Sequence, residues 1–355
     1  MNSARQKPEH SLQNGASGWA SASGALHTFG TPRASIIIPA FNAENTIARA
    51  LNSARSQSEG RLEIIVVDDA STDQTSAIVA DTAAVDPRVR LLCLPVNAGP
   101  GAARNRGIAI AEGDWIALLD ADDSYHPERI EKLLDFADRV GADMVADNIL
   151  LCDTTGHDPD TLMIPPMLLS QPTELTTAEF IARNVGSPRT PRVSYGFLKP
   201  LLRAHFLREK QLVYDERNRF AEDFMLYVLC LTNGARWWLL PEAMYRYAVV
   251  PGSLTEQQSS NDLMRLRQME SELLADPRVN VDPLLVRAII RHKSVLDRCY
   301  YYRAFTDAVK GGNLRRAAKL LTDSRKSAQL IVQESTRQLP TILGKALRGG
   351  YIAHE

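Results

Sequence analysis

The chain has 355 residues, of which 45% are hydrophobic, as is usual for a globular protein with a full core. Lysine and arginine number 41 and aspartate and glutamate 42, which gives a formal net charge of -1. This balance provides no general electrostatic attraction to nucleic acid, so we expect no nucleic-acid partner.

The cysteines and the apolar segments indicate the cellular compartment of the protein. The 4 cysteines never form a C-x-x-C pair, which favours buried thiols in a reducing compartment over a disulfide or zinc framework. There is no run of about 18 apolar residues, the length that a membrane-spanning helix needs. Residues 1–33 lack the apolar core of a signal peptide. We therefore expect a cytoplasmic protein.

Along the chain, short apolar runs alternate with segments of helical periodicity. Residues 1–33 are rich in Ser, Gly, Ala and Gln and are predicted to be a disordered tail. Strands are predicted after this tail, each followed by a helix, at 35–38, 63–67, 89–94 and 115–119. This alternation indicates an α/β fold, a doubly wound and largely parallel sheet. Such sheets bind ligands at the carboxyl ends of their strands, where the acidic clusters of this chain lie.

The second half of the chain has a different pattern. The alternation fades after Asp147, and residues 153–192, which carry many Pro and Thr, are predicted to be irregular. A helix is predicted at 222–231, a strand at 237–240 and further helices over 261–340. The predicted parts are therefore a tail at 1–33, a sheet domain at 34–255 and a helical C-terminal extension at 256–355.

The most informative segment is Asp120-Ala121-Asp122-Asp123, directly after the fourth predicted strand. Carboxylates at positions i and i+2 can converge on one divalent cation, and such hard oxygen ligands suit Mg²⁺ or Mn²⁺ shared with a substrate's phosphates. Three neighbouring carboxylates also repel one another, and a cation holds them ionised together. The alternative is a solvated turn whose aspartates cap the next helix.

Asp68-Asp69 follows the second predicted strand in the same way. An acidic residue at this place can accept a hydrogen bond from a ribose hydroxyl or a base N–H. The alternative is that this turn only caps the next helix, through Ser71, Thr72 or Asp73. Both can hold, with Asp73 at the helix and Asp69 at the ligand.

A glycine-containing loop, residues 97–107, joins the third strand to its helix. Its spacing is not G-x-G-x-x-G, because Arg104 stands at the place of the third glycine. The favoured interpretation is a helix N-terminus whose amides and Arg104 face phosphate. Arg104 as a plain ion-pair partner is the alternative.

Four motifs, in this order, resemble those of the inverting family 2 glycosyltransferases of GT-A fold: Pro39-Ala40-Phe41-Asn42 and residues 67–73, 97–107 and 119–123. The resemblance covers residues 34–255. It implies that the nucleoside pocket is bordered by Pro39, Phe41, Glu44 and Asp69. It also implies that Asp120 and Asp122 hold the ribose, the diphosphate and the metal. UDP is the expected nucleotide, since Asp69 can accept a hydrogen bond from uracil N3–H.

The family also carries a Glu-Asp pair on a helix that faces the acceptor, here Glu222-Asp223. Inverting transfer is a single displacement in which a base removes the proton of the acceptor hydroxyl, and the metal stabilises the leaving diphosphate. We assign the base to Asp223 and a supporting role to Glu222. Arg246 is the candidate for a contact with the diphosphate. The alternative is a pair of exposed acids favoured by the helix dipole.

The narrower resemblance is to bacterial exopolysaccharide glycosyltransferases of the succinoglycan type. It implies transfer of glucose from a UDP-sugar to a polyprenyl-diphosphate-linked saccharide. The Q-x-x-R-W motif of processive synthases is absent, so we expect one sugar per encounter. A basic and apolar helical segment near residues 314–325 is compatible with peripheral contact with the inner face of the plasma membrane, although a helix that is simply solvated on its basic side is the more common explanation.

Two other functions remain open on the sequence. An aspartate-nucleophile phosphohydrolase would use Asp120 as nucleophile and Asp122 as acid and base, but such enzymes place the motif on their first strand. A nucleotide-sugar-binding scaffold without turnover would have no physical need for both Asp122 and Asp223. Release of inorganic phosphate would favour the first function, and donor binding without transfer would favour the second.

Overall fold

The computed structural model describes residues 31–152, 161–185, 194–249, 259–322 and 325–349. The tail predicted for residues 1–33 lies outside these ranges apart from its last three residues. The predicted boundary between residues 255 and 256 also lies outside them.

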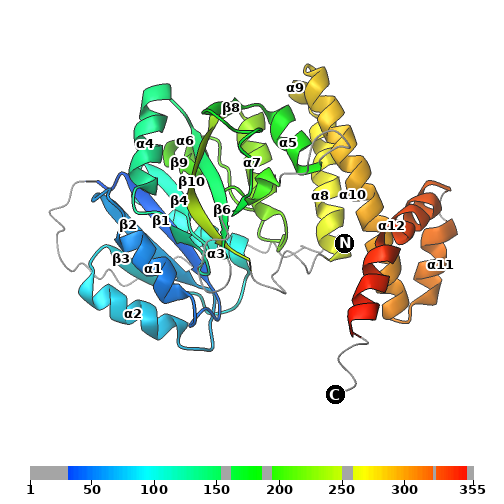
Figure 1. The fold of residues 1–355 in the computed structure, drawn as a ribbon, viewed down its shortest axis with the longest axis horizontal. Helices are drawn as coiled ribbons and strands as arrows, with labels where there is room; N and C mark the ends of the chain where they lie inside the picture. The colour runs from blue at the N-terminus through cyan, green and yellow to red at the C-terminus, as the bar shows by residue number, and fades with distance from the viewer. Residues whose placement is uncertain (1–30, 153–160, 186–193, 250–258, 323–324, 350–355) are drawn as a thin grey trace, which may run out of the picture. The chain divides into compact units, whose positions relative to one another are not determined.

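A mixed β-sheet forms the centre of the described chain, with strand order β3-β2-β1-β4-β9-β6-β10-β5 (Figure 1). Its strands are β1 (Ala34–Ala40), β2 (Leu62–Asp68), β3 (Val89–Cys93), β4 (Trp115–Leu118), β5 (Ser124–Tyr125), β6 (Met144–Cys152), β9 (Leu201–Arg203) and β10 (Trp237–Ala248). Two short strands pair at its margin, β7 (Thr161–Leu162) with β6 and β8 (Thr173–Leu175) with β10. Strands β1 to β4 are parallel to one another, as are β6 and β10, while β9 runs antiparallel between β4 and β6. The predicted α/β class with a mostly parallel sheet is confirmed.

The helices of the sheet domain are α1 (Ile47–Arg55), α2 (Thr75–Val85), α3 (Pro100–Ala109), α4 (Arg129–Val140), α5 (Thr177–Val185), α6 (Ala204–Glu209) and α7 (Glu222–Thr232), with a 3-10 turn at Tyr195–Phe197. The C-terminal helices are α8 (Ser260–Ala275), α9 (Pro277–Asn280), α10 (Pro283–Lys310), α11 (Leu314–Thr322) and α12 (Arg325–Gly349). Helix α10 contacts α5 and the other C-terminal helices, so the helical region is joined to the sheet domain through α5 (Figure 1).

The first strands are buried on both faces. Every residue of β2 is buried, and in β1 only Pro39 is partly exposed. This explains why their β-branched runs read as parallel strands. Gly107 allows α3 to lie directly on the sheet, because a Cβ atom there would be 2.5 Å from Cγ2 of Ile37. The strand ends and the N-terminus of α3 are thereby brought together at one edge.

The expectation of irregular structure over residues 153–192 is wrong in its described part. Helix α5 lies within it and buries Phe180 and Ile181 against α7 and α10. The sequence also fails to predict β6 and gives β10 only its first four residues. Tertiary contacts rather than local preference stabilise these elements, because β6 and β10 pair along most of their lengths.

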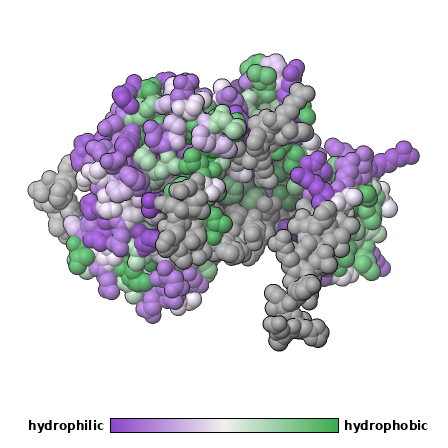
Figure 2. Space-filling view, in the orientation of Figure 1, coloured by the Kyte–Doolittle hydropathy of each residue, from purple (hydrophilic) through white to green (hydrophobic). Residues whose placement is uncertain are grey.

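The surface of the described residues is uneven in polarity. Hydrophilic residues predominate over the side of α1, α2 and α4, whereas hydrophobic residues gather in a hollow near the middle of the same face (Figure 2). None of the helices in the described ranges combines the length and the hydropathy that crossing a membrane requires.

Candidate active site

A cavity of about 840 Å³ lies where β1, β2 and β4 end, and it extends to helices α7, α8 and α10. Its polar wall carries most of the residues singled out in the sequence, namely Pro39, Phe41, Asp69, Arg104, Asp120, Asp122, Glu222 and Asp223. Its other wall includes the side chains of Leu263, Leu266, Val295 and Leu296 from α8 and α10. The cavity is therefore polar at the strand ends and apolar toward the C-terminal helices.

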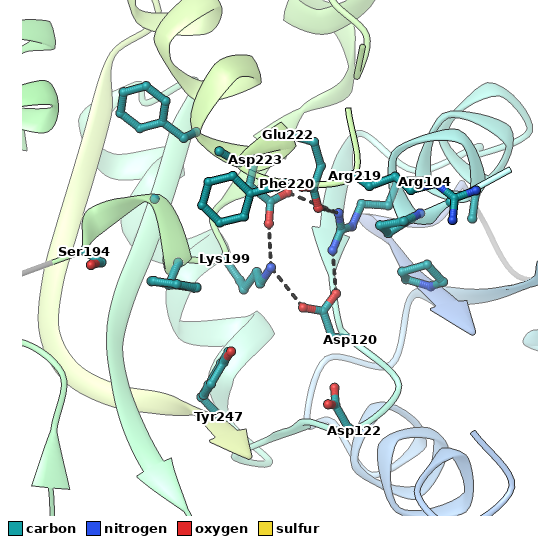
Figure 3. Close-up of a pocket in the computed structure, with 18 of the residues that line it drawn as sticks. Arg104, Asp120, Asp122, Ser194, Lys199, Arg219, Phe220, Glu222, Asp223 and Tyr247 are labelled. Atoms are coloured by element: carbon teal, nitrogen blue, oxygen red, sulfur yellow. Dashed lines mark hydrogen bonds and ion pairs between the residues drawn. The ribbon is translucent and has the colours of Figure 1, made fainter. Parts of the chain in front are cut away.

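Asp120 lies just beyond the end of β4, between two cationic side chains (Figure 3). Nη2 of Arg104 donates a hydrogen bond to its Oδ1 at 2.7 Å, and Nζ of Lys199 lies 3.0 Å from its Oδ2. Burial raises the pKa of Asp120, but the charges of Lys199 and Arg104 outweigh burial and hold that pKa well below its usual value. Asp120 is therefore an ionised carboxylate in a charged network.

Asp122 is in a different environment. Nη2 of Arg49 donates a hydrogen bond to the backbone carbonyl of Asp122 at 2.5 Å. The carboxylate oxygens of Asp122 form no hydrogen bond or ion pair with another residue of the described chain. Burial, and next the charge of Asp120, raise the pKa of Asp122. A half-buried carboxylate that bonds to no other described residue and lies beside a second carboxylate is a site that a hard cation would stabilise.

The donor set fits Mg²⁺ or Mn²⁺ shared with a substrate. Within the described ranges, no third His, Cys, Asp or Glu joins Asp120 and Asp122 to complete a protein-only metal site. Mg²⁺ is commonly held by one or two carboxylates together with water and substrate phosphates. Two carboxylates at the edge of an open cavity meet that requirement.

The third carboxylate of the segment, Asp123, has a structural role. Its side chain is buried, its Oδ2 accepts a hydrogen bond from Oη of Tyr245 at 2.6 Å, and its Oδ1 accepts one from the backbone N–H of Ala248 at 2.8 Å. Burial, with the charge of Asp120 next, raises the pKa of Asp123 well above its usual value. Asp123 thus fastens the end of β10 to the loop that carries Asp120 and Asp122.

The second acidic pair, Glu222 and Asp223, begins helix α7. Nη1 of Arg104 donates to Oε1 of Glu222 at 2.7 Å, and Nζ of Lys199 donates to Oδ2 of Asp223 at 2.6 Å. Burial and the charge of Asp223 raise the pKa of Glu222. The alternative of two exposed acids is wrong, because Asp223 is only 7% exposed. Arg104 and Lys199 therefore each connect α7 to Asp120, as the dashed lines of Figure 3 show.

Lys199 is the main site residue that the sequence does not predict. It precedes β9 and is 4% exposed, with its amine between Asp120 and Asp223. Burial lowers the pKa of Lys199, but these two carboxylates raise it well above its usual value. The string Lys199-Pro200-Leu201-Leu202 is visible in the sequence, but no spacing rule gives its lysine a partner. Arg219 and Phe220, just before α7, also line the cavity without a sequence signal.

Asp69 lines the cavity and also holds the loop after β3. Its two carboxylate oxygens accept hydrogen bonds from the backbone N–H groups of Ala98 and Gly99, each at 2.8 Å. Gly99 has φ of 93°, a conformation that favours glycine. Asp73 accepts a hydrogen bond from the N–H of Thr75, the first residue of α2, at 3.0 Å, although the N-cap position itself is held by Gln74, whose side chain makes no capping bond. A contact of Asp69 with the nucleoside stays a prediction.

Two predicted site residues are not brought to the cavity wall. The carboxylate of Glu44 accepts a hydrogen bond from the backbone N–H of Gln74 at 3.0 Å, at the start of α2. Arg246 pairs with Ser124 of β5 and stands between Tyr245, which bonds Asp123, and Tyr247, which lines the cavity. Because side chains alternate along a strand, Arg246 points to the opposite face. Neither residue contacts the cavity in this conformation.

Residues 35–185 match the model of the family described as glycosyl transferase family 2. The succinoglycan biosynthesis protein ExoO of Rhizobium meliloti (strain 1021) is 37% identical in sequence to this chain, over a match that covers 69% of this chain and 67% of ExoO. The succinoglycan biosynthesis protein ExoU of the same strain is 35% identical, over a match that covers 77% of this chain and 78% of ExoU. The chain belongs to glycosyl transferase family 2. It is therefore a glycosyltransferase.

The fold of this glycosyltransferase also resembles a solved structure. S. aureus TarS 1-349, in complex with UDP-GlcNAc, superposes with a TM-score of 0.59 at 20% sequence identity, over 86% of this chain and 92% of that one. This likeness confirms the GT-A-like fold.

Proposed function

We propose that this glycosyltransferase transfers one sugar, glucose, from a UDP-sugar to a saccharide acceptor with inversion at the anomeric carbon. We place the reaction in exopolysaccharide or surface-polysaccharide biosynthesis, which the names of ExoO and ExoU support. The UDP-GlcNAc bound by TarS supports a UDP-linked donor. One observation carries the proposal: the pairs Asp120/Asp122 and Glu222/Asp223 meet in one cavity, joined through Arg104 and Lys199.

The donor occupies the end of the cavity beside the strands. Pro39, Phe41 and Asp69 border the nucleoside, and Asp120 and Asp122 hold a divalent cation, Mg²⁺ or Mn²⁺. When bound, that cation neutralises the charge that develops on the departing diphosphate. The cationic side chain of Arg104, from the middle of α3, lies beside the same end, where it pairs with Asp120 and Glu222.

The acceptor hydroxyl lies beside α7. Its oxygen forms a bond to C1 of the donor sugar, the bond from C1 to the diphosphate oxygen breaks, and the proton passes to the carboxylate of Asp223. The amine of Lys199, now 2.6 Å from Asp223, must turn toward Asp120 or the diphosphate for this carboxylate to act as base. Glu222 supports the arrangement by holding Arg104 in place.

The acceptor is a saccharide carried on polyprenyl diphosphate. Helix α11 supports a peripheral contact with an anionic membrane, because Leu314 is 69% exposed and Arg315, Arg316 and Lys319 are exposed beside it. We also propose that residues 34–255 form the GT-A domain and residues 256–355 a helical extension.

Membership of the family argues against the other two functions. A scaffold without turnover gives no reason for a second acidic pair in the same cavity.

A transfer assay tests the proposal. A panel of UDP-sugars would be incubated with Mn²⁺ and alkyl glycoside acceptors, and the anomeric configuration of the product would be read by NMR. We expect UDP-glucose to be the preferred donor and an α-linked donor to give a β-linked product. A product with retained configuration, or release of inorganic phosphate without transfer, would contradict it.

A further inference from the structure

The wall of the cavity that α10 forms contains a histidine with a defined partner, His292. Its Nδ1 shares a short hydrogen bond with Oε1 of Glu270, which projects from α8. Glu270 is 1% exposed and His292 7% exposed, so the pair is buried. The sequence gives no signal for it, because the two residues come from different helices.

The ring of His292 is fixed in orientation as well as in partner. It stacks on the ring of Phe224, with centroids 5.0 Å apart and an angle of 20° between the planes. Phe224 stacks in turn on Phe180 of α5, with centroids 5.3 Å apart. Phe224 follows Asp223 in α7, so the ring on which His292 stacks belongs to the residue next to the proposed base. A side chain held by both stacking and hydrogen bonding is preorganised for binding.

The second ring nitrogen is different. Nδ1 is occupied by Glu270, whereas no residue of the described chain hydrogen-bonds Nε2. Unlike Oε2 of Glu270, Nε2 is not one of the fully enclosed polar atoms that lack a partner in the described residues, so it keeps some accessible surface. An accessible polar atom of a residue that lines a cavity is commonly satisfied by a ligand. A sugar hydroxyl can both donate and accept a hydrogen bond, so it can pair with Nε2 whether or not that nitrogen carries a proton.

We propose that His292 binds a hydroxyl group of the acceptor sugar through Nε2 and that Glu270 positions it. This inference rests on the proposed function, since it places the acceptor between Asp223 and the wall formed by α10. The C-terminal helices thereby take part in acceptor recognition and do not only cover the sheet domain. The nucleotide-sugar lies at the other end of the cavity and makes no contact with His292.

The test compares the His292→Phe variant with the wild type, using UDP-glucose, Mn²⁺ and octyl β-D-glucoside or octyl β-D-galactoside as acceptor probe. Phenylalanine keeps the stacking on Phe224 and removes both ring nitrogens, so Glu270 also loses its partner. We expect the acceptor KM to rise about tenfold, as loss of one hydrogen bond to a preorganised group predicts, with the donor KM unchanged. The glycoside, added together with UDP, should raise the melting temperature of the wild type but not that of His292→Phe.

Three further variants separate binding from structure. Glu270→Leu should raise the acceptor KM, and Glu270→Gln, which keeps an oxygen for Nδ1–H, should raise it less. Ile290→Ala, at a 54% exposed position of α10 that does not line the cavity, is the matched control and should behave as the wild type.

The outcomes are distinguishable. An unchanged acceptor KM in His292→Phe, or an equal rise in donor and acceptor KM, would overturn the role of His292 while leaving the proposed function intact. A wild-type protein that neither transfers to nor is stabilised by any of these glycosides would count against the proposed function and, with it, against this inference.

Discussion

The two ends of the cavity are built in different ways. At the proposed donor end the predicted site residues follow strands β1, β2 and β4, which are buried and paired in parallel, so each side chain leaves a rigid edge. At the proposed acceptor end they project from helices α7 and α10, whose positions depend on stacked aromatic rings. Arg104 and Lys199 connect the two ends through charge. Variants at the two ends should therefore separate donor binding from sugar transfer.

The largest effect is expected for Asp223→Asn. An amide cannot accept the proton of the acceptor hydroxyl, and loss of a general base typically costs about a thousandfold in rate. The kcat for transfer should fall by that order, while stabilisation of the protein by UDP with Mn²⁺ stays at the wild-type level. Glu222→Gln should lose less activity. Normal transfer by Asp223→Asn would show that the base is elsewhere.

Lys199→Met should break the connection between the ends. Its removal leaves Asp120 and Asp223 with Arg104 as the remaining one of the two cations they share, and breaking a buried ion pair in this way costs about 3 kcal/mol. Urea denaturation should show this loss in the free energy of unfolding. Lys199→Arg, which keeps the charge, should retain more of the stability. A fully stable Lys199→Met protein would mean that Arg104 alone balances these carboxylates.

Phe41→Ala tests the donor end alone. Phe41 lines the cavity and is 49% exposed, as expected for a ring that a flat ligand covers when it binds. Loss of an aromatic contact should raise the Kd for UDP about fivefold, with little change in kcat at saturating donor. Val85→Ala, at a 75% exposed position outside the cavity, serves as the control. If UDP binds both variants equally well, the nucleoside lies elsewhere in the cavity.

The smallest effect is expected for Arg246→Ala. Because Arg246 points away from the cavity, the donor KM should change by less than about twofold, as for most substitutions away from a site. Steady-state kinetics with varied donor would detect a larger change. A rise of more than tenfold would show that β10 rearranges when the donor binds.

The contrast between the two ends also explains what the sequence predicts. The runs Ile36-Ile37-Ile38 and Val66-Val67 indicate buried parallel strands. The aspartates that follow such strands must lie at one edge of the sheet. The sequence therefore predicts that Asp120 and Asp122 lie at the carboxyl edge of the sheet.

The acceptor end is less predictable because its contacts join distant segments. Nothing local pairs Lys199 with Asp223, or His292 with Glu270, since helical periodicity gives a buried face but not its partner. The sequence draws attention to the segment around Arg246, but which of its neighbouring residues faces the cavity depends on the register of the strand. Helix α5 also depends on its packing against α7 and α10.

Calorimetric titration of UDP into the wild type and into Asp122→Asn, each with and without Mn²⁺, tests the central claim most directly. The claim is that Asp120 and Asp122 hold a divalent cation together with the diphosphate. We predict that Mn²⁺ strengthens UDP binding by the wild type and has no such effect on Asp122→Asn, while Asp223→Asn behaves as the wild type. Equal strengthening by Mn²⁺ in the wild type and in Asp122→Asn would contradict it.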